Sequence, residues 1–184
     1  QEIRLSTNQI SFDLDANAFL RLVLSELSFC QRYGQKRSHE SCDEGCHFTG
    51  YLCNAIKNCV SNRFSISVQQ YAQSLAWILG DLKVNIEHLR VILPHALAHR
   101  IQWHDKIVAQ WDNDMRNDPL SIYMAKKAVN EMHRRYLEQS YRIKEALAVA
   151  YRISEGEALE PILGDHPIFW DIRKDLGEQY STVS

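Results

Sequence analysis

Glycine is scarce in this chain, with seven residues among 184. None of them belongs to a G-x-x-x-x-G-K-S/T phosphate loop, a G-x-G-x-x-G dinucleotide turn or a G-x-S-x-G nucleophile elbow, and the H-E-x-x-H metal motif is also missing. These motifs position phosphates, catalytic nucleophiles or hydrolytic zinc in many enzymes. Without them, we expect that the chain does not form a complete enzyme by itself.

Long apolar runs and an excess of basic charge are also missing. No apolar stretch reaches the roughly 18 residues of a membrane-spanning helix, and the N-terminal residues lack both parts of a secretion signal. The formal net charge is −2 and the pI is about 6.5, so no overall positive field attracts nucleic acid. We therefore expect a cytoplasmic protein with no membrane insertion and no nucleic-acid partner. Because the sequence begins with Gln1 and not with Met, we also expect a piece of a longer polypeptide.

Helical periodicity accounts for most of the apolar residues, and the sequence predicts an all-α fold. The pattern predicts a strand at residues 3–5 and helices over residues 17–29, 64–79, 86–93, 96–111 and 169–176. Asp15 can act as the N-cap of the first helix, Gly80 should end the second, and Asn85 can cap the third. Pro94 is expected to kink the chain or to start a new helix.

The last third of the chain carries a heptad pattern. Its first seam positions are Ile122, Val129, Tyr136, Ile143 and Ala150, and its second seam positions are Ala125, Met132, Gln139 and Ala146. This pattern predicts one helix of about 50 Å, which is too long to be buried along its whole length against one small bundle. The helix should pack against another helix of this chain or against another subunit, or the chain should fold back near Gly156.

Four of the five cysteines lie between residues 42 and 59, and the residues from 31 to 44 are polar and show no periodicity. Structural disulfides are disfavoured, because the count is odd and the chain carries no secretion signal. Clustered thiols in such a chain favour a metal site, since thiolates are ligands of tetrahedral zinc and of iron–sulfur clusters. The spacing therefore predicts a metal-stapled loop at residues 30–59, with zinc or an iron–sulfur cluster as the cofactor.

The ligand set that we favour is Cys30, Cys42, Cys46 and Cys53, with Cys59 or His47 as substitutes. Cys30 is included because it follows a predicted helix at the point where the polar stretch begins. If residues 51–58 are helical, Cys53 and Cys59 point about 120° apart and compete for one ligand position. Free thiols that act as small apolar side chains are the alternative.

Three histidines, His88, His95 and His99, are spaced so that they could share one face of a helix. Such a face could hold a second metal ion, but Pro94 interrupts the spacing. We therefore favour buried or capping roles for these histidines.

The segment from Ser61 to Ile101 reads SNRFSISVQQYAQSLAWILGDLKVNIEHLRVILPHALAHRI. A Ser-x-Arg opens a helix of alternating leucine and alanine, a charged turn follows, and a second helix begins near Val84 and Glu87 and ends in His99-Arg100. This layout resembles the C-terminal helical lid of MoxR-type AAA+ ATPases. The cysteines just before the Ser-x-Arg are also similar to a cluster in some of these lids.

The resemblance implies that Arg63 is the sensor 2 residue, which reaches from the lid toward the γ-phosphate of ATP, with Ser61 beside it. An arginine at a helix start suits that role, because its charge is permanent and the helix dipole adds positive potential. ATP and Mg²⁺ would be bound by an AAA+ core outside this sequence, and the partners would be that core, neighbouring ring subunits and a client protein. The lid would occupy residues 1–116, and residues 117–184 would form a helical extension.

The function implied by the resemblance is the coupling of ATP binding and hydrolysis in that core to chaperone-like remodelling of the client. A second hypothesis, of another class, is a free-standing zinc-bearing helical module that binds other proteins and never meets ATP. The native reading frame separates the two hypotheses, because only the first requires an upstream core with a P-loop.

Overall fold

The computed structural model describes residues 9–28, 52–112 and 117–177, and the fold within these ranges is mainly helical. The described helices are α2 (Leu14–Ser28), the short 3₁₀ helix η1 (Leu52–Asn54), α3 (Asn62–Leu79), α4 (Ile86–Ala98), α5 (Asp105–Asp112), α6 (Leu120–Ser154) and α7 (Pro167–Asp175). The predicted all-α class is confirmed at this level, and the strand predicted at residues 3–5 lies outside the described ranges. Across these ranges, no helix combines the length and the apolar character that a membrane crossing requires.

Helix α2 begins about one turn earlier than predicted. Its N-cap is Asp13, whose Oδ1 accepts a hydrogen bond from the backbone N–H of Ala16 at 2.6 Å. The prediction that Asp15 caps this helix is wrong, because its carboxylate accepts hydrogen bonds from Tyr136 Oη at 2.6 Å and from Lys144 Nζ at 2.9 Å. These two bonds hold the pKa of Asp15 below its usual value. The Asp15 carboxylate, which the local sequence pattern assigned to the N-cap of α2, thus binds side chains of the distant helix α6.

Helices α3 and α4 form a hairpin whose connection matches the prediction. Gly80 ends α3 in the left-handed conformation, with a φ of 78°. Asn85 caps α4 by accepting from the backbone N–H of His88, and the His88 ring accepts from the backbone N–H of Asn85 in return. His88 is therefore a buried capping residue, as expected. The connection also contains β2 (Lys83–Val84), which pairs in parallel with β1 (Ser11–Phe12), a short sheet that the sequence did not predict.

The prediction of a helix over residues 96–111 is wrong. Helix α4 continues through Pro94 to Ala98, and a turn follows at residues 99–100. Lys57 then donates its backbone N–H to the carbonyl of Gln102 at 2.6 Å, and His104 donates to the carbonyl of Ala55 at 2.9 Å. These long-range bonds satisfy backbone groups that a continuous helix would have paired internally, so helical structure resumes only at α5.

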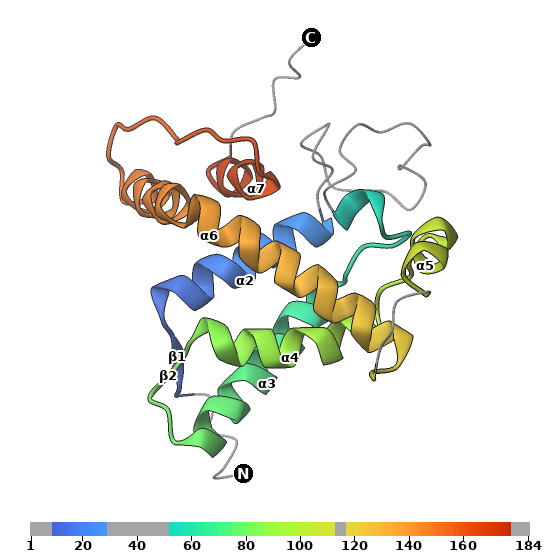
Figure 1. Cartoon of the computed structure of the whole chain (residues 1–184). Helices are drawn as coiled ribbons and strands as arrows, with labels where there is room; N and C mark the ends of the chain where they lie inside the picture. The colour runs from blue at the N-terminus through green and yellow to red at the C-terminus, as the bar shows by residue number, and fades with distance from the viewer. Residues whose placement is uncertain (1–8, 29–51, 113–116, 178–184) are drawn as a thin grey trace.

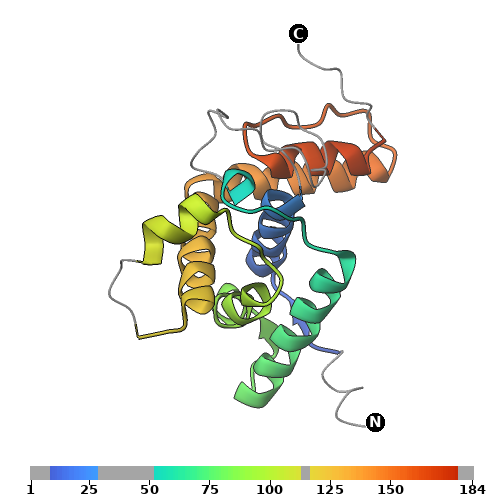
Figure 2. The ribbon, with the colours of Figure 1, turned by 90° about the vertical axis from the view of Figure 1, so that its right-hand side faces the viewer.

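Helix α6 confirms the prediction of one long helix, and helices of the same chain cover its seam. Figure 1 shows α6 lying across α2 and α4, and both contacts are extensive. Figure 2 shows α4 between α6 and α3. The seam residues Val129, Tyr136 and Ile143 are buried in these contacts. The chain then turns at Gly156, where φ is 95°, and α7 returns to pack against α2 and α6.

The predicted boundary between residues 116 and 117 falls just before α6. Buried side chains of α2, α3, α4, α6 and α7 belong to one apolar cluster, so the segments on the two sides of the boundary share a core. The division into a lid and an extension stays a prediction.

Candidate functional site

The predicted sensor residue, Arg63, lies in the first turn of α3 with its side chain exposed. Ser61 is the N-cap of this helix, and its side chain makes no capping hydrogen bond. Among the residues that the structure describes, no carboxylate pairs with the Arg63 guanidinium. The start of α3 therefore combines an available cation with helix N–H groups that the cap side chain leaves unbonded, and both features attract anions.

Arg100 packs against the same turn of α3. Its guanidinium carbon lies 5.6 Å from the centre of the buried Phe64 ring, and its Nη2 lies 3.4 Å from Ser67 Oγ. Ser67 Oγ in turn donates a hydrogen bond to the carbonyl oxygen of Arg63 at 2.8 Å. The Phe64 ring and the Ser67 hydroxyl therefore hold the Arg100 guanidinium about one helical turn from Arg63.

A hollow of about 380 Å³ lies between the end of α2 and the start of α3. It is lined by Leu24, Ser28, Val60, Ser61, Ser65 and Ile66. Its three serine hydroxyls can both donate and accept hydrogen bonds. Ser61 lines this hollow and Arg63 does not, so the two predicted nucleotide-binding residues are neighbours in sequence without lining one common cavity.

Two of the predicted metal ligands, Cys53 and Cys59, fall within the described ranges. The others, which are Cys30, Cys42, Cys46 and His47, lie outside them. Cys53 is buried in η1, and Cys59 is partly exposed in the segment that leads to α3. The prediction that Cys53 and Cys59 compete for one ligand position assumed a helix over residues 51–58, and within the described part of that range only η1, Leu52–Asn54, is helical. No group of three or more potential ligands is assembled among the described residues, and the metal site stays a prediction.

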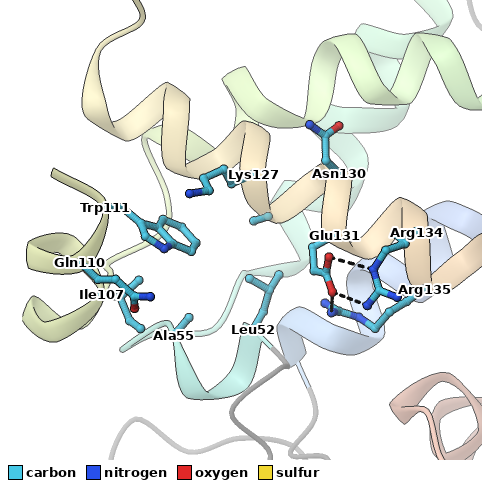
Figure 3. A pocket seen from close by; sticks show the side chains of 11 residues that line it. Leu52, Ala55, Ile107, Gln110, Trp111, Lys127, Asn130, Glu131, Arg134 and Arg135 are labelled. Carbon is cyan, nitrogen blue, oxygen red and sulfur yellow. Dashed lines mark hydrogen bonds and ion pairs between the residues drawn. The ribbon is translucent and has the colours of Figure 1, made fainter. Parts of the chain in front are cut away.

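A larger hollow, of about 570 Å³, opens between η1, α5 and α6. Figure 3 shows apolar side chains of η1 and α5 on one side of it and charged side chains of α6 on the other. Its lining includes Leu52, Ile107, Trp111, Glu131, Arg134 and Arg135. Its volume falls in the range of small-molecule sites, which is about 300–1,000 Å³.

Ion pairs neutralise the arginines of this larger hollow. Glu131 Oε1 lies 2.6 Å from Arg134 Nη2 and 2.9 Å from Arg135 Nη1, and the hydrogen bonds from Arg134 hold the pKa of Glu131 below its usual value. Arg135 also binds the buried Glu26, through Nε at 2.6 Å and through Nη2 at 2.7 Å. His166 Nε2 lies 2.9 Å from the same Glu26 carboxylate. Because each arginine has a carboxylate partner, the arginines do not select one class of ligand here.

The sequence pattern did not predict this hollow or its ion pairs. The spacing of four between Glu131 and Arg135 is a recognisable helix signal, but the partner Glu26 is far away in the sequence. Glu26 lies among the apolar residues on the buried face of α2. Because a carboxylate is rarely buried without a partner, its position there was the one sequence signal of a buried ion pair.

Comparisons of the chain with protein-family models, with curated proteins and with solved structures find no match. The function must therefore be inferred from the residues and their geometry.

Proposed function

We propose that the chain is the helical lid and sensor 2 part of a MoxR-like AAA+ ATPase whose ATP-binding core lies outside this sequence. The observation that carries the proposal is Arg63, which is exposed in the first turn of an 18-residue helix and has no carboxylate partner among the described residues. Such an arginine is available to a phosphate, and its planar, permanently charged group suits one. The capped hairpin of α3 and α4 is consistent with the segment that resembles these lids.

In this proposal, ATP in the core attracts Arg63, and the lid turns as one body. Helix α3 packs against α4, and α4 packs against α6, so a movement of the first turn of α3 is carried along the long helix. The contacts of Arg100 with Phe64 and Ser67 attach the end of α4 to that turn. Nucleotide hydrolysis would thereby move a client protein that is bound to the lid or to its extension.

A zinc ion or an iron–sulfur cluster belongs to the same proposal, as a staple between α2 and α3. Its ligands would be Cys30, Cys42, Cys46 and Cys53, with Cys59 or His47 as substitutes. Cys53 and Cys59 stand on either side of residues 55–57, whose backbone pairs with residues 102–104. A metal held there would be attached to a segment that is fixed to the fold and leads directly into the helix of Arg63.

In the intact ATPase, Arg63→Ala is expected to lower ATP turnover by about 100-fold, as the loss of one charge-stabilising contact at a reacting group does in other enzymes. The melting temperature should change little, because the side chain is exposed and has no described ion pair. Steady-state ATP hydrolysis and melting curves of the parent and the variant test this. The 184-residue chain alone should neither hydrolyse ATP nor bind it tightly, since one arginine cannot replace a P-loop.

Arg100→Ala is the matched control, because it removes a second exposed arginine beside the same turn. It should lower the melting temperature through the lost contact with Phe64 and leave turnover near the parental rate. If Arg100→Ala slows turnover while Arg63→Ala does not, the sensor is Arg100. If neither variant changes turnover, the lid proposal is wrong and the zinc-bearing interaction module takes its place.

Freshly prepared, reduced protein is expected to contain about one zinc ion or one iron–sulfur cluster per chain. Removal of the metal should loosen residues 30–60, because metal binding supplies folding free energy to a loop that is stapled in this way. Elemental analysis measures the content, and hydrogen exchange compares the two forms. Protein that is purified anaerobically and contains neither metal excludes the staple.

A further inference from the structure

A third hollow, of about 310 Å³, lies between α3 and the C-terminal end of α4. It is lined by Tyr71, Ile92, His95, Ala96, His99 and Arg100. Tyr71, Ile92 and Ala96 make part of this lining apolar. His95, His99 and Arg100 are exposed, so their nitrogen atoms can be reached by a ligand.

The lining of this hollow contains a cation and no carboxylate. No lining residue is acidic, and α3 contains neither aspartate nor glutamate along its whole length. The one carboxylate of α4, Glu87, lies in the first turn at the opposite end and is bound by Arg90 at 3.0 Å. Arg100 contacts Ser67 and Phe64, and among the described residues no carboxylate neutralises it. The hollow therefore favours an anionic ligand.

His95 and His99 are one helical turn apart, a spacing that can also hold a divalent metal ion. Two features argue against a metal here. The permanently charged guanidinium of Arg100 borders the same hollow and repels a cation, and the described residues assemble no group of three potential ligands. An acidic ligand instead gains an ion pair with the guanidinium of Arg100 and hydrogen bonds from the imidazole N–H groups.

We propose that this hollow binds an acidic segment of a partner protein, with one apolar side chain in the hollow and flanking carboxylates on Arg100, His95 and His99. Its volume is at the lower end of the range of ligand sites, about 300–1,000 Å³, and therefore fits a side chain better than a cofactor. A protein segment supplies both the apolar group and the charge, whereas a phosphate backbone supplies mainly charge. Clustered cationic side chains recognise acidic motifs in many complexes. The proposal does not depend on the ATPase function.

The probe for the test is a fluorescein-labelled, amidated peptide in which glutamates flank a single phenylalanine on both sides. Fluorescence anisotropy with the whole chain, at low salt and about pH 6.5, is expected to show saturable binding. A matched peptide with glutamines in place of the glutamates, and another with serine in place of phenylalanine, should each bind more weakly. Inorganic phosphate and a thymidine oligonucleotide of equal charge should not displace the peptide at equal concentration.

Substitutions of the lining residues test whether the peptide binds in this hollow. Arg100→Gln is expected to weaken binding roughly twofold to fivefold, as the loss of one exposed ion pair does. His95→Gln and His99→Gln, added to it, should remove measurable binding. Lys83→Gln is the matched control, since it removes an exposed cation from β2, between the two helices of the same hairpin, and should leave the affinity unchanged. Circular dichroism verifies that each variant is folded.

The proposal is overturned if the peptide does not bind, if the glutamine peptide binds equally well, or if the oligonucleotide displaces the acidic peptide.

Discussion

Replacement of Val129 and Ile143 together by aspartate is expected to unfold the protein at room temperature. The two side chains are 1% and 0% exposed, on the face of α6 that packs against α2 and α4. Each substitution removes an apolar contribution of about 1.5–3 kcal/mol and buries a carboxylate at a cost of several kcal/mol. A whole domain is stable by only about 5–15 kcal/mol, so two such changes offset most or all of it. Circular dichroism and size-exclusion chromatography measure the result.

Leu137→Asp and Tyr141→Asp are matched controls on the same helix, because these side chains are 59% and 78% exposed. Each control should leave the melting temperature nearly unchanged. If the Val129→Asp/Ile143→Asp variant keeps the hydrodynamic size and the melting temperature of the parent, the seam is not what attaches α6 to the bundle.

Arg135→Met is expected to lower the free energy of unfolding by about 3–5 kcal/mol at neutral pH, the usual loss when one partner of a buried ion pair is removed. Arg135 donates two hydrogen bonds to Glu26, and the two side chains are only 7% and 0% exposed. Without the guanidinium, the buried carboxylate keeps its contact with His166 but no longer has a permanent countercharge. Denaturant unfolding followed by circular dichroism measures the loss.

The size of this loss should depend on pH. Burial by itself would raise the pKa of Glu26, but hydrogen bonds from His166 and Arg135 outweigh it and hold the pKa below the ordinary value of 4.5. In the parent, the ionised carboxylate therefore stabilises the fold above about pH 4.5, and this contribution disappears as the pH falls through the lowered pKa. In Arg135→Met, the pKa of Glu26 is higher than in the parent, because the hydrogen bonds and the charge of Arg135 no longer lower it, and the penalty of the buried charge disappears once the carboxyl is protonated. The difference between parent and variant should thus be large near about pH 7 and smaller near about pH 4.

Two further variants separate the ion pair from other effects. Glu26→Leu combined with Arg135→Met should recover part of the lost stability, since an apolar pair can replace a buried ion pair. Arg134→Met, at the exposed neighbouring position, should alter stability little. An Arg135→Met protein as stable as the parent at neutral pH would show that the pair adds nothing to the fold.

Much of the local structure could be predicted from the sequence. The turn after α3 needs a residue in the left-handed conformation, and Gly80 adopts it most easily. Asn85 caps α4 through a hydrogen bond that spans three residues, and the heptads mark the buried face of α6. These features depend on interactions between residues that are close in the chain, so the sequence pattern carries them.

The errors concern contacts between distant segments. Asp15 bonds to Tyr136 and Lys144 of α6 instead of capping its own helix. The helix predicted over residues 96–111 is interrupted because residues 102–104 pair with residues 55–57. In both places a local preference of about 1 kcal/mol gives way to a long-range partner that the local pattern does not contain.

For the candidate sites, the sequence by itself determined which groups are available: an arginine at a helix start, clustered thiols, and a pair of histidines four residues apart at the end of α4. The tertiary structure decided what each group faces. It left Arg63 exposed with no described carboxylate partner, set Arg100 beside Ser67 and Phe64, and buried Glu26 against Arg135. The physical reason is that charge neutralisation and hollow formation require side chains of separate helices, and those meet only when the apolar faces of α2, α3, α4 and α6 have packed into one core.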